Sequence, residues 1–526
     1  MRAGGSKGKA EDREIRGLLA YHSTGLDVKM KIWLDTSPHP HHKHNDCGDC
    51  TNPFAPPDSI TWPLVEDNIA AVQGLALERT TPLYMQQCGE ERWLICNPSG
   101  SGRVAVFDTQ AMSLFSLFET PVTLSRAVQM VTDWPRERIT RIVTLFYRLG
   151  FLREVAKPSS FNQGELPQTL TAWLHVTNEC NLRCHYCYLH KTKEDMASDV
   201  GHKAIDAIFR SALKHRFKNI KLKYAGGEAS LRMMGVMVMH DYAVQLAQEH
   251  GITLEATILS NGVVLSQRTI DHLKARHISV TISLDGLGDY HDSQRPLVGG
   301  RGSCQYVLRT IDRLLANEVV PFISVTISRR NLDGLPGLMQ YILAHELPFS
   351  LNYYRDNECS AHITDLRFAD EQIISAMRSV FAVIEEKLPV RSLLACLLDK
   401  ADMTALHQHT CSVGQNYLVI DQNGGIAKCQ MEIKRTITTV NAHDPLQVIR
   451  EDRRGVQGLA VEEKEGCRDC EWRYWCTGGC PLLTYRSTGR YDVKSPNCNI
   501  YKALFPEVLR LEAIRLLRYE MPVGLN

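Results

Sequence analysis

The stretch CNLRCHYCYLH, residues 180–190, decides the fold class of this chain. It follows the run TAWLHVT, residues 171–177, whose alternation of bulky and polar side chains predicts a β-strand. Three thiolates on so short a loop can hold three irons of a cuboidal four-iron cluster and leave the fourth iron open to a small chelating ligand. These thiolates belong to Cys180, Cys184 and Cys187. A structural zinc site is less favoured, because zinc usually takes four ligands in two C-x2-C pairs and no second pair follows nearby.

Three further stretches follow the cysteine loop along the chain. They are YAGGEAS at residues 224–230, LSNG at residues 259–262 and SLDG at residues 283–286. Together with Tyr186, the aromatic residue before the third cysteine, they resemble the motifs of the radical S-adenosylmethionine (SAM) superfamily. The resemblance implies a [4Fe-4S] cluster whose open iron binds the amino and carboxylate groups of SAM. Electron transfer into the sulfonium then releases a 5′-deoxyadenosyl radical, which abstracts hydrogen from a substrate.

The resemblance also implies which residues contact SAM. Gly226 and Gly227 leave room for close approach to the methionyl amine, and the Glu228 carboxylate accepts from that amine. An ordinary strand-exit turn is the alternative interpretation of residues 260–262. The other expected SAM contacts are Tyr186, Ser260, Asn261, Ser283, Asp285 and Arg295, of which the last three are the weaker candidates.

The composition sets the broad class of the protein. At 526 residues the chain is long enough for two to four domains. Its 60 Lys and Arg residues against 59 Asp and Glu residues give a net charge of +1, which provides no general attraction to nucleic acid or to a membrane. We find no apolar span of transmembrane length and no secretory signal, so a cytoplasmic protein is expected. In that reducing compartment its 17 cysteines indicate metal or redox centres rather than disulfides.

The first two segments of the chain differ in pattern. Residues 1–78 show little apolar periodicity and contain the His- and Cys-rich stretch SPHPHHKHNDCGDC, residues 37–50. A metal site is one interpretation of this stretch, but a flexible extension is favoured because no helix or strand would hold the ligands in place. Residues 79–156 combine the hairpin of RWLIC and RVAVF with helical stretches, which predicts a small winged-helix module. Its basic and acidic residues are nearly balanced, which argues against DNA binding.

This module resembles the PqqD-like precursor-peptide recognition domain of many peptide-modifying radical SAM enzymes. In that family an extended leader peptide adds as a strand to the sheet edge and packs against the third helix. The alternative is a structural cap on the next domain. A polar linker at residues 157–169 leads into residues 170–395, where six strand-like runs alternate with amphipathic segments. This α/β alternation predicts parallel strands and resembles the partial (β/α)6 TIM-like barrel of the radical SAM family.

A second set of cysteines lies within residues 396–500. Cys411 and Cys429 flank two short runs around Asn423 and Gly424, which predict a hairpin, and CRDCEWRYWCTGGC follows. This spacing resembles the SPASM extension, which carries two auxiliary iron–sulfur clusters. By that resemblance one cluster is bound by Cys467, Cys470, Cys476 and Cys498. The other is bound by Cys411, Cys429 and Cys480, and its fourth ligand is Cys396, another residue or the substrate. Two zinc sites are the alternative, and residues 501–526 are expected to form a helix.

Together these features predict a radical SAM enzyme that crosslinks or oxidises a ribosomally synthesised precursor peptide and receives electrons from a donor such as flavodoxin or ferredoxin. An anaerobic sulfatase-maturase type enzyme, which makes formylglycine, is the first alternative. It is weakened because Gln430 stands where that family has the Asp that acts as base, which leaves Tyr417, Asp421 or a residue of 353–357 as candidates. A noncatalytic winged-helix protein with structural zinc is the alternative from another class, and the Gly-Gly-Glu element argues against it.

Overall fold

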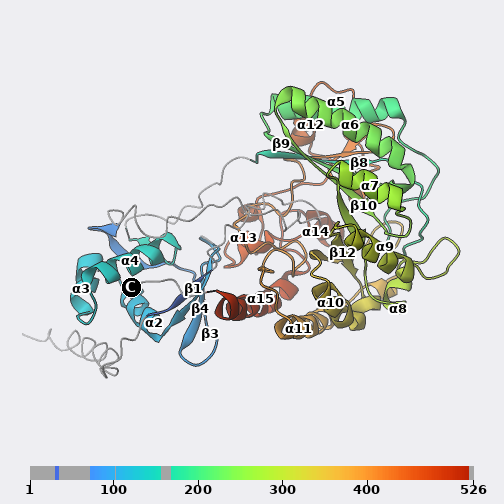
Figure 1. The fold of residues 1–526 in the computed structure, drawn as a ribbon. Helices are drawn as coiled ribbons and strands as arrows, with labels where there is room; N and C mark the ends of the chain where they lie inside the picture. Colours follow the sequence, from blue (N-terminus) through green and yellow to red (C-terminus); the bar gives the residue numbers. More distant parts are fainter. Residues whose placement is uncertain (1–29, 35–71, 101, 156–166, 521–526) are drawn as a thin grey trace, which may run out of the picture. The chain divides into compact units, whose positions relative to one another are not determined.

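The computed structural model describes residues 30–34, 72–100, 102–155 and 167–520. The chain folds into two compact units (Figure 1). Of the described residues, 30–34, 72–155 except 101, and 509–520 belong to the first unit, and 167–508 belong to the second. The His- and Cys-rich stretch at residues 37–50 and most of the expected linker lie outside the described residues.

Among its described residues, the first unit contains two antiparallel sheets, three whole α-helices and the last residues of a fourth. One sheet has the order β1 (Ile32–Leu34), β5 (Val104–Asp108), β4 (Arg92–Cys96) and β3 (Tyr84–Gln87). The other has the order β6 (Val122–Thr123), β2 (Ala76–Arg79) and β7 (Leu152–Glu154). The helices are α2 (Thr109–Ser116), α3 (Leu124–Met130) and α4 (Arg136–Arg148). The predicted β4–β5 hairpin is confirmed, and Asp108 caps α2 by accepting from the Ala111 N–H at 2.8 Å.

The core of the first unit is aromatic. The Phe107 ring of β5 stacks on the Phe146 ring of α4 with centroids 4.9 Å apart, and the Phe115 and Phe151 rings meet Phe107 edge-on. Strand β1 also belongs to this core, because Ile32 and Leu34 are buried in the same cluster. The segment expected to be a flexible extension up to residue 78 therefore contains a strand that is paired and buried at residues 32–34.

The second unit is built on a parallel sheet. Its six neighbouring strands run in the order β13 (Phe349–Tyr353), β12 (Phe322–Ile327), β11 (Ser279–Ser283), β10 (Thr253–Ser260), β9 (Asn219–Ala225) and β8 (Thr169–His175). Every adjacent pair of these six strands is parallel. The alternation of strands and helices is the α/β arrangement that the sequence predicts, and all six predicted strands are present.

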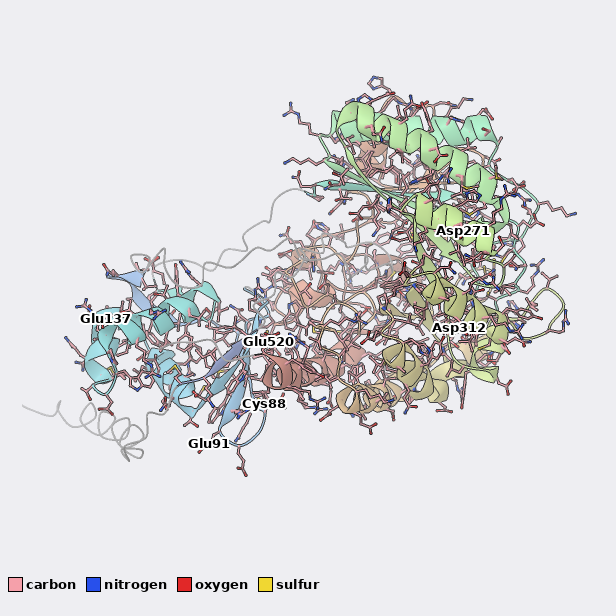
Figure 2. The ribbon with its side chains drawn as sticks, viewed as in Figure 1. Cys88, Glu91, Glu137, Asp271, Asp312 and Glu520 are labelled. Carbon is pink, nitrogen blue, oxygen red and sulfur yellow. The ribbon has the colours of Figure 1, made fainter. Side chains whose placement is uncertain are left out.

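Helices follow the strands and carry charged side chains on their outer faces, such as Asp271 of α7 and Asp312 of α9 (Figure 2). The longer helices are α5 (Ser198–Lys214), α6 (Met233–His250), α7 (Gln267–Ala275), α9 (Cys304–Ala316), α10 (Leu335–Ala344) and α11 (Asp370–Glu386). Short elements are α8 (Asp289–Asp292) and the 3-10 turns at Ala229–Arg232, Arg329–Gly334 and Thr364–Leu366.

The cysteine-rich region continues the same sheet. Strand β14 (Tyr417–Ile420) pairs in parallel with β8, and β15 (Gly425–Ala427) and β16 (Thr438–Thr439) add to it in antiparallel fashion. The hairpin predicted around Asn423 and Gly424 is thereby confirmed, with Gly424 at φ +83° in the turn. The helices of this region are α12 (Pro445–Glu451), α13 (Arg473–Cys476), α14 (Pro481–Thr488) and α15 (Cys498–Tyr519).

Among the residues that the structure describes, no helix is both long enough and apolar enough to cross a membrane.

Candidate functional site

The cysteine loop is held by direct backbone contact with the end of β9. The Gly227 N–H donates to the Thr177 carbonyl oxygen at 2.7 Å, and the Glu228 N–H donates to the Glu179 carbonyl oxygen at 2.9 Å. A Cβ atom on Gly226 would lie 2.5 Å from the Thr177 oxygen, and one on Gly227 would lie 2.3 Å from the Glu179 oxygen. Both positions therefore require glycine for a structural reason, close backbone contact, that the sequence analysis did not identify. Their expected approach to the methionyl amine stays a prediction.

The Glu228 carboxylate joins the ends of two strands. It is buried, with 2% of the residue exposed. Its oxygens accept from the Ser260 hydroxyl at 2.9 Å, the Asn261 N–H at 2.6 Å and the Ser230 N–H at 3.1 Å. The Asn261 side-chain amide in turn donates to Asn181 Oδ1 at 2.7 Å and lies 3.8 Å from Cys180 Sγ. Two of the three stretches that follow the cysteine loop in the sequence, YAGGEAS and LSNG, thus meet at that loop.

A buried network fixes the aromatic residue of the loop. The Tyr186 hydroxyl donates to Asp285 Oδ2 at 2.6 Å and accepts from the Arg295 guanidinium. The Arg295 guanidinium also lies 3.8 Å from that carboxylate oxygen, and the Thr326 N–H donates to Asp285 Oδ1 at 2.8 Å. Burial raises the pKa of Asp285, while the charge of Arg295 opposes that rise. Asp285 and Arg295 therefore hold the Tyr186 side chain in place. The Ser283 side chain, at the end of β11, forms no hydrogen bond with a residue that the structure describes.

The three loop cysteines converge on one cation. Burial acts to lower the pKa of Lys191, but the charges of Cys187, Cys180 and Cys184 raise it above its usual value. Burial raises the pKa of Cys180, and it raises the pKa of Cys184 to about 12. A thiol must lose its proton to bind iron, so loading this site releases protons and Lys191 stabilises the thiolates that form. The donor set fits an iron–sulfur cluster: three cysteines on one loop, a nearby amide and a compensating cation. Lys191 lies just beyond the predicted loop, and its role was missed because only the fold shows where its side chain points.

Several cysteines of the second set lie near one another, and their assignment to two clusters stays a prediction. Cys411 and Cys429 are buried in one cluster with Val413, Val456 and Leu482, and Cys480 packs against it. Cys467, Cys470 and Cys498 are the cysteines whose charges act on Cys476, the fourth member of the other set. Burial raises the pKa of Cys467 to about 11 and that of Cys476 to about 12. By contrast, the Cys396 thiol donates to the Leu393 carbonyl oxygen at 3.5 Å, and its charged neighbours are Arg391 and Asp402.

A buried lysine stands between the two auxiliary sets. The Lys464 side chain donates from Nζ to the Thr477 carbonyl oxygen at 2.7 Å, and only 2% of the residue is exposed. Its charge acts on Cys411 and Cys480 of one set and on Cys467 and Cys476 of the other. Burial lowers the pKa of Lys464. The sequence analysis did not identify this residue, although it precedes Cys467 by only three positions.

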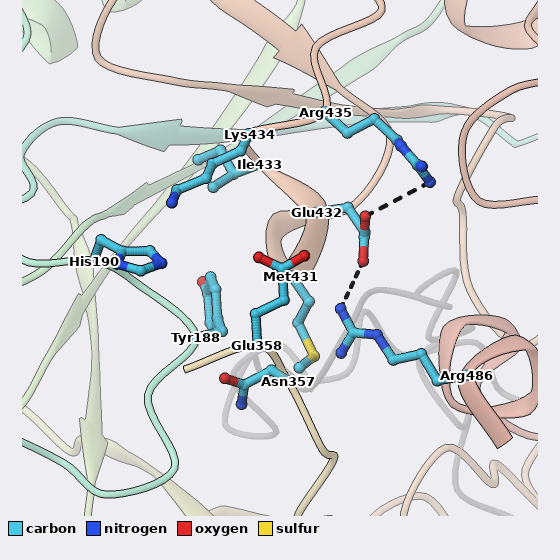
Figure 3. A pocket seen from close by; sticks show the side chains of 10 residues that line it. All are labelled: Tyr188, His190, Asn357, Glu358, Met431, Glu432, Ile433, Lys434, Arg435 and Arg486. Atoms are coloured by element: carbon cyan, nitrogen blue, oxygen red, sulfur yellow. Dashed lines mark hydrogen bonds and ion pairs between the residues drawn. The ribbon is translucent and has the colours of Figure 1, made fainter. Parts of the chain in front are cut away.

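A pocket of about 350 Å³ lies beside the cysteine loop (Figure 3). It brings together side chains from the loop, from the end of β13, from the segment after Cys429 and from α14. The Glu432 carboxylate on its wall is held by the Arg486 guanidinium at 2.6 Å and by Arg435 at 3.9 Å. Figure 3 shows the Glu358 carboxylate and the Lys434 ammonium directed into the opening near His190. The lining residues are Tyr188, His190, Asn357, Glu358, Met431, Glu432, Ile433, Lys434, Arg435 and Arg486.

The candidate bases differ in their hydrogen-bond partners. Asp421 accepts from the Asn423 and Gly425 N–H groups, both at 2.8 Å, so it stabilises the hairpin turn. The Tyr417 hydroxyl donates to Gln430 Oε1 at 3.3 Å. Asn357 donates to the Tyr186 carbonyl oxygen at 3.1 Å. Glu358, directly after the stretch 353–357, forms no hydrogen bond or ion pair with any residue that the structure describes, and it is the carboxylate that enters the pocket.

No group of three or more His, Cys, Asp or Glu side chains within the described part of the chain is arranged as the ligands of a single metal ion would be.

Comparison with protein families adds an independent observation. Residues 174–340 match the radical SAM superfamily. These residues form a radical SAM domain. The match includes the cysteine loop and the strand ends that carry Glu228, Asn261 and Asp285. The domain implies the [4Fe-4S] cluster and SAM that the sequence analysis expects, and the cysteine loop fits that cluster.

Two curated relatives and one solved structure resemble the chain. The uncharacterised protein MJ0907 of Methanocaldococcus jannaschii is 29% identical over 173 residues, which is 32% of this chain and 57% of that protein. AlbA of Bacillus subtilis, an antilisterial bacteriocin subtilosin biosynthesis protein, is 23% identical over 330 residues, which is 60% of this chain and 68% of AlbA. The chain thus spans little more than half of MJ0907. The structure of anSMEcpe with bound AdoMet and a Cp18Cys peptide shares the fold, with a TM-score of 0.54 and 16% identity over 66% of this chain and 99% of that one.

The glycine contact yields a first prediction. We expect Gly227→Ala to lower the free energy of unfolding of the radical SAM domain by about 1–3 kcal/mol, because the new Cβ meets backbone oxygens that cannot rotate away. Less iron should bind as the loop is displaced. Gly235→Ala in α6 is the matched control, since nothing lies within 4 Å of its Cβ position, and we expect it to be neutral or stabilising. Urea unfolding followed by circular dichroism measures both changes, and equal midpoints for the two variants would contradict the contact.

The network at Tyr186 yields a second prediction. We expect Arg295→Met to lower the free energy of unfolding by about 3–5 kcal/mol, because it leaves the Asp285 carboxylate buried without its cation. Arg490→Met removes an arginine that pairs with Asp492 at the surface and should leave the urea midpoint nearly unchanged. If Arg295→Met unfolds at the same urea concentration as the Arg490 variant, Arg295 does not hold the loop.

Proposed function

We propose that this chain reductively cleaves SAM at a [4Fe-4S] cluster bound by Cys180, Cys184 and Cys187, and uses the radical to crosslink or oxidise a ribosomally synthesised precursor peptide. The observation that carries the proposal is the pocket that joins the cysteine loop to the segment after Cys429. A substrate in this pocket lies between the site of radical formation and the first auxiliary cysteine set. AlbA, whose name assigns it to the biosynthesis of a bacteriocin, supports a peptide as substrate.

When bound, the cluster and SAM supply a 5′-deoxyadenosyl radical. The residues of this chain would bind the cluster and SAM, orient them and exclude water. Cys180, Cys184 and Cys187 supply the thiolates, and Lys191 compensates part of their charge. Glu228 is the acceptor proposed for the methionyl amine, and its bonds to Ser260 and Asn261 fix its orientation before SAM binds. Tyr186, held by Asp285 and Arg295, fixes the loop from the opposite side.

Glu358 is the proton acceptor that we propose for the substrate. Oxidation of a peptide releases a proton as well as electrons, and a carboxylate that faces the pocket can take that proton. The auxiliary clusters proposed at the two further cysteine sets would take the electron, and flavodoxin or ferredoxin would be the external donor. Lys434 adds positive charge to the same opening, and Lys434 and His190 are proposed to orient a carboxylate or carbonyl oxygen of the peptide.

Residues 79–156 are proposed to be the winged-helix recognition domain for the leader of that peptide, and residues 396–500 the SPASM extension. The terminal helix expected at residues 501–526 corresponds to α15 (Cys498–Tyr519). The antiparallel sheet and the three helices after it support the recognition domain. The formylglycine alternative is not favoured, since Gln430 follows Cys429 and its amide accepts from Tyr417. The zinc alternative is not favoured either, because it leaves the Glu228 network at the cysteine loop without a function.

A direct test is reductive cleavage of SAM. The anaerobically reconstituted chain, incubated with SAM and dithionite, should form 5′-deoxyadenosine, and Cys180→Ala should reduce this product to background because the cluster loses one of its three ligands. Cys88→Ala, which removes a half-buried cysteine of the first unit, is the matched control and should leave the yield unchanged. Chromatography of the nucleoside products gives the readout. A wild-type chain that holds no iron, or that leaves SAM intact, would refute the proposed function.

The role of Glu358 gives a further prediction. Glu358→Gln should lower the yield of modified precursor peptide by about 10²-fold or more, since the amide cannot accept the proton. Formation of 5′-deoxyadenosine should stay close to the wild-type rate, because the pocket residue is not needed for SAM cleavage. Glu371→Gln on the exposed first turn of α11 serves as the control. Mass spectrometry of the peptide and nucleoside analysis of the same reaction separate the two effects, and parallel loss of both products would contradict this assignment.

A further inference from the structure

We propose that strand β1 of this chain competes in cis with the precursor peptide for the edge of strand β5, so that only a peptide with aliphatic side chains at alternate positions and a sufficient fit is recognised. The inference rests on the proposed function, because it concerns how the precursor peptide is recognised.

Strand β1 is joined to the unit as a bound peptide would be. Its three residues pair in antiparallel register with β5, with Ile32 opposite Phe107 and Leu34 opposite Ala105. The Asp108 N–H donates to the Lys31 carbonyl oxygen at 3.1 Å, and the Lys31 N–H donates to the Asp108 carboxylate at 2.5 Å. Residues 35–71 separate β1 from Val72, where the continuous part of the described unit begins. Strand β1 is therefore an addition at the edge of a sheet formed by later residues.

The side chains of this segment have a clear pattern. Met30, Ile32 and Leu34 belong to the same buried cluster as Phe107 of β5 and the α4 side chains. Because alternate residues of a strand face the same side, these three side chains fill one apolar groove. Trp33 points to the other face, where the Arg92 guanidinium lies 4.7 Å from the centre of its ring. Main-chain bonds would hold any extended peptide at this edge, and the apolar row selects its sequence.

The opposite edge of the sheet does not offer the same surface. The side chains of β3 are alternately half-buried and exposed, and Met85 is 41% exposed. An aliphatic row laid along β3 would stay in contact with water and gain little. The β5 edge, with Val104 to Phe107 all buried, is the one that accepts aliphatic side chains.

An equivalent segment of another chain can take the place of β1, because it forms the same hydrogen bonds and fills the same groove. The chain's own segment has an advantage, since tethering gives it an effective concentration on the order of millimolar. A precursor peptide must therefore carry a recognition segment with the same alternation, aliphatic, any, aliphatic, aromatic, aliphatic, or a better fit. A weak match would not displace β1, so the tethered strand sets a threshold for recognition.

The test uses the full chain and a labelled synthetic peptide, KMKIWLDT, which copies residues 29–36. We expect the double variant Ile32→Asp, Leu34→Asp to bind this peptide at least about tenfold more tightly than the wild-type chain, because the charged segment leaves the groove. Met85→Asp on β3 is the matched control and should bind as the wild type does. A peptide with the two aspartates should not bind any of these chains. Fluorescence anisotropy measures each affinity.

A second measurement covers the case in which the double variant does not fold. At millimolar concentration the same peptide should displace β1 from β5 in the wild-type chain. An isotope-labelled peptide should then crosslink to β5, and hydrogen exchange should show protection of the β5 backbone. Equal affinity for the double variant and the wild type, or protection confined to β3, would overturn the proposal. These readouts need neither iron nor SAM. A chain that binds the peptide but does not cleave SAM would refute the proposed function and leave the docking site standing.

Discussion

The close contact between the Gly226–Gly227 backbone and residues 177–179 is the constraint on which the site depends. At this point a β-strand and a cysteine loop approach more closely than any side chain would allow. The contact places Glu228 beside the ends of β9 and β10, and from there its carboxylate binds Ser260 and Asn261. A loop that carries three metal-binding thiols is thereby held by the main chain of the sheet. Main-chain hydrogen bonds, which do not depend on side-chain rotamers, fix the geometry of the loop.

Buried charge completes the support. Asp285 and Arg295 bind the Tyr186 hydroxyl, and Lys191 and Lys464 lie near the cysteines. Each of these groups loses solvation free energy when it is buried. Interaction with a partner of opposite charge or with a carbonyl oxygen offsets part of that loss. Such pairs favour one arrangement over others because a displaced partner leaves an unpaired charge in a medium of low polarity. The cysteine sets are therefore defined by electrostatics as well as by packing.

Much of this arrangement could be predicted from the sequence. The six parallel strands follow from alternating apolar runs, so local pattern was sufficient for them. The assignment of the later cysteines to two auxiliary sets stays a prediction from their spacing. The structure then added what depends on distant parts of the chain. Strand β1 has only three residues, too few for a periodic signal, and it forms because β5 accepts it. Lys464 and Glu358 carry no local signal either, since their roles depend on which thiols or loops the fold brings near them. The two glycines were found, but their contact with the loop backbone was not.

One feature of the sheet has a consequence for electron flow. Strand β14 pairs with β8 on one side and with β15 on the other. Strand β15 leads into Cys429, while β8 leads into the loop of Cys180. Tunnelling between redox centres weakens steeply with separation, so a spacing that varied with loop motion would make the rate erratic. With the clusters bound as proposed, three consecutive strands of one sheet would set the spacing between them. Motion of the surrounding loops would then change access for the substrate without changing the span that an electron must cross.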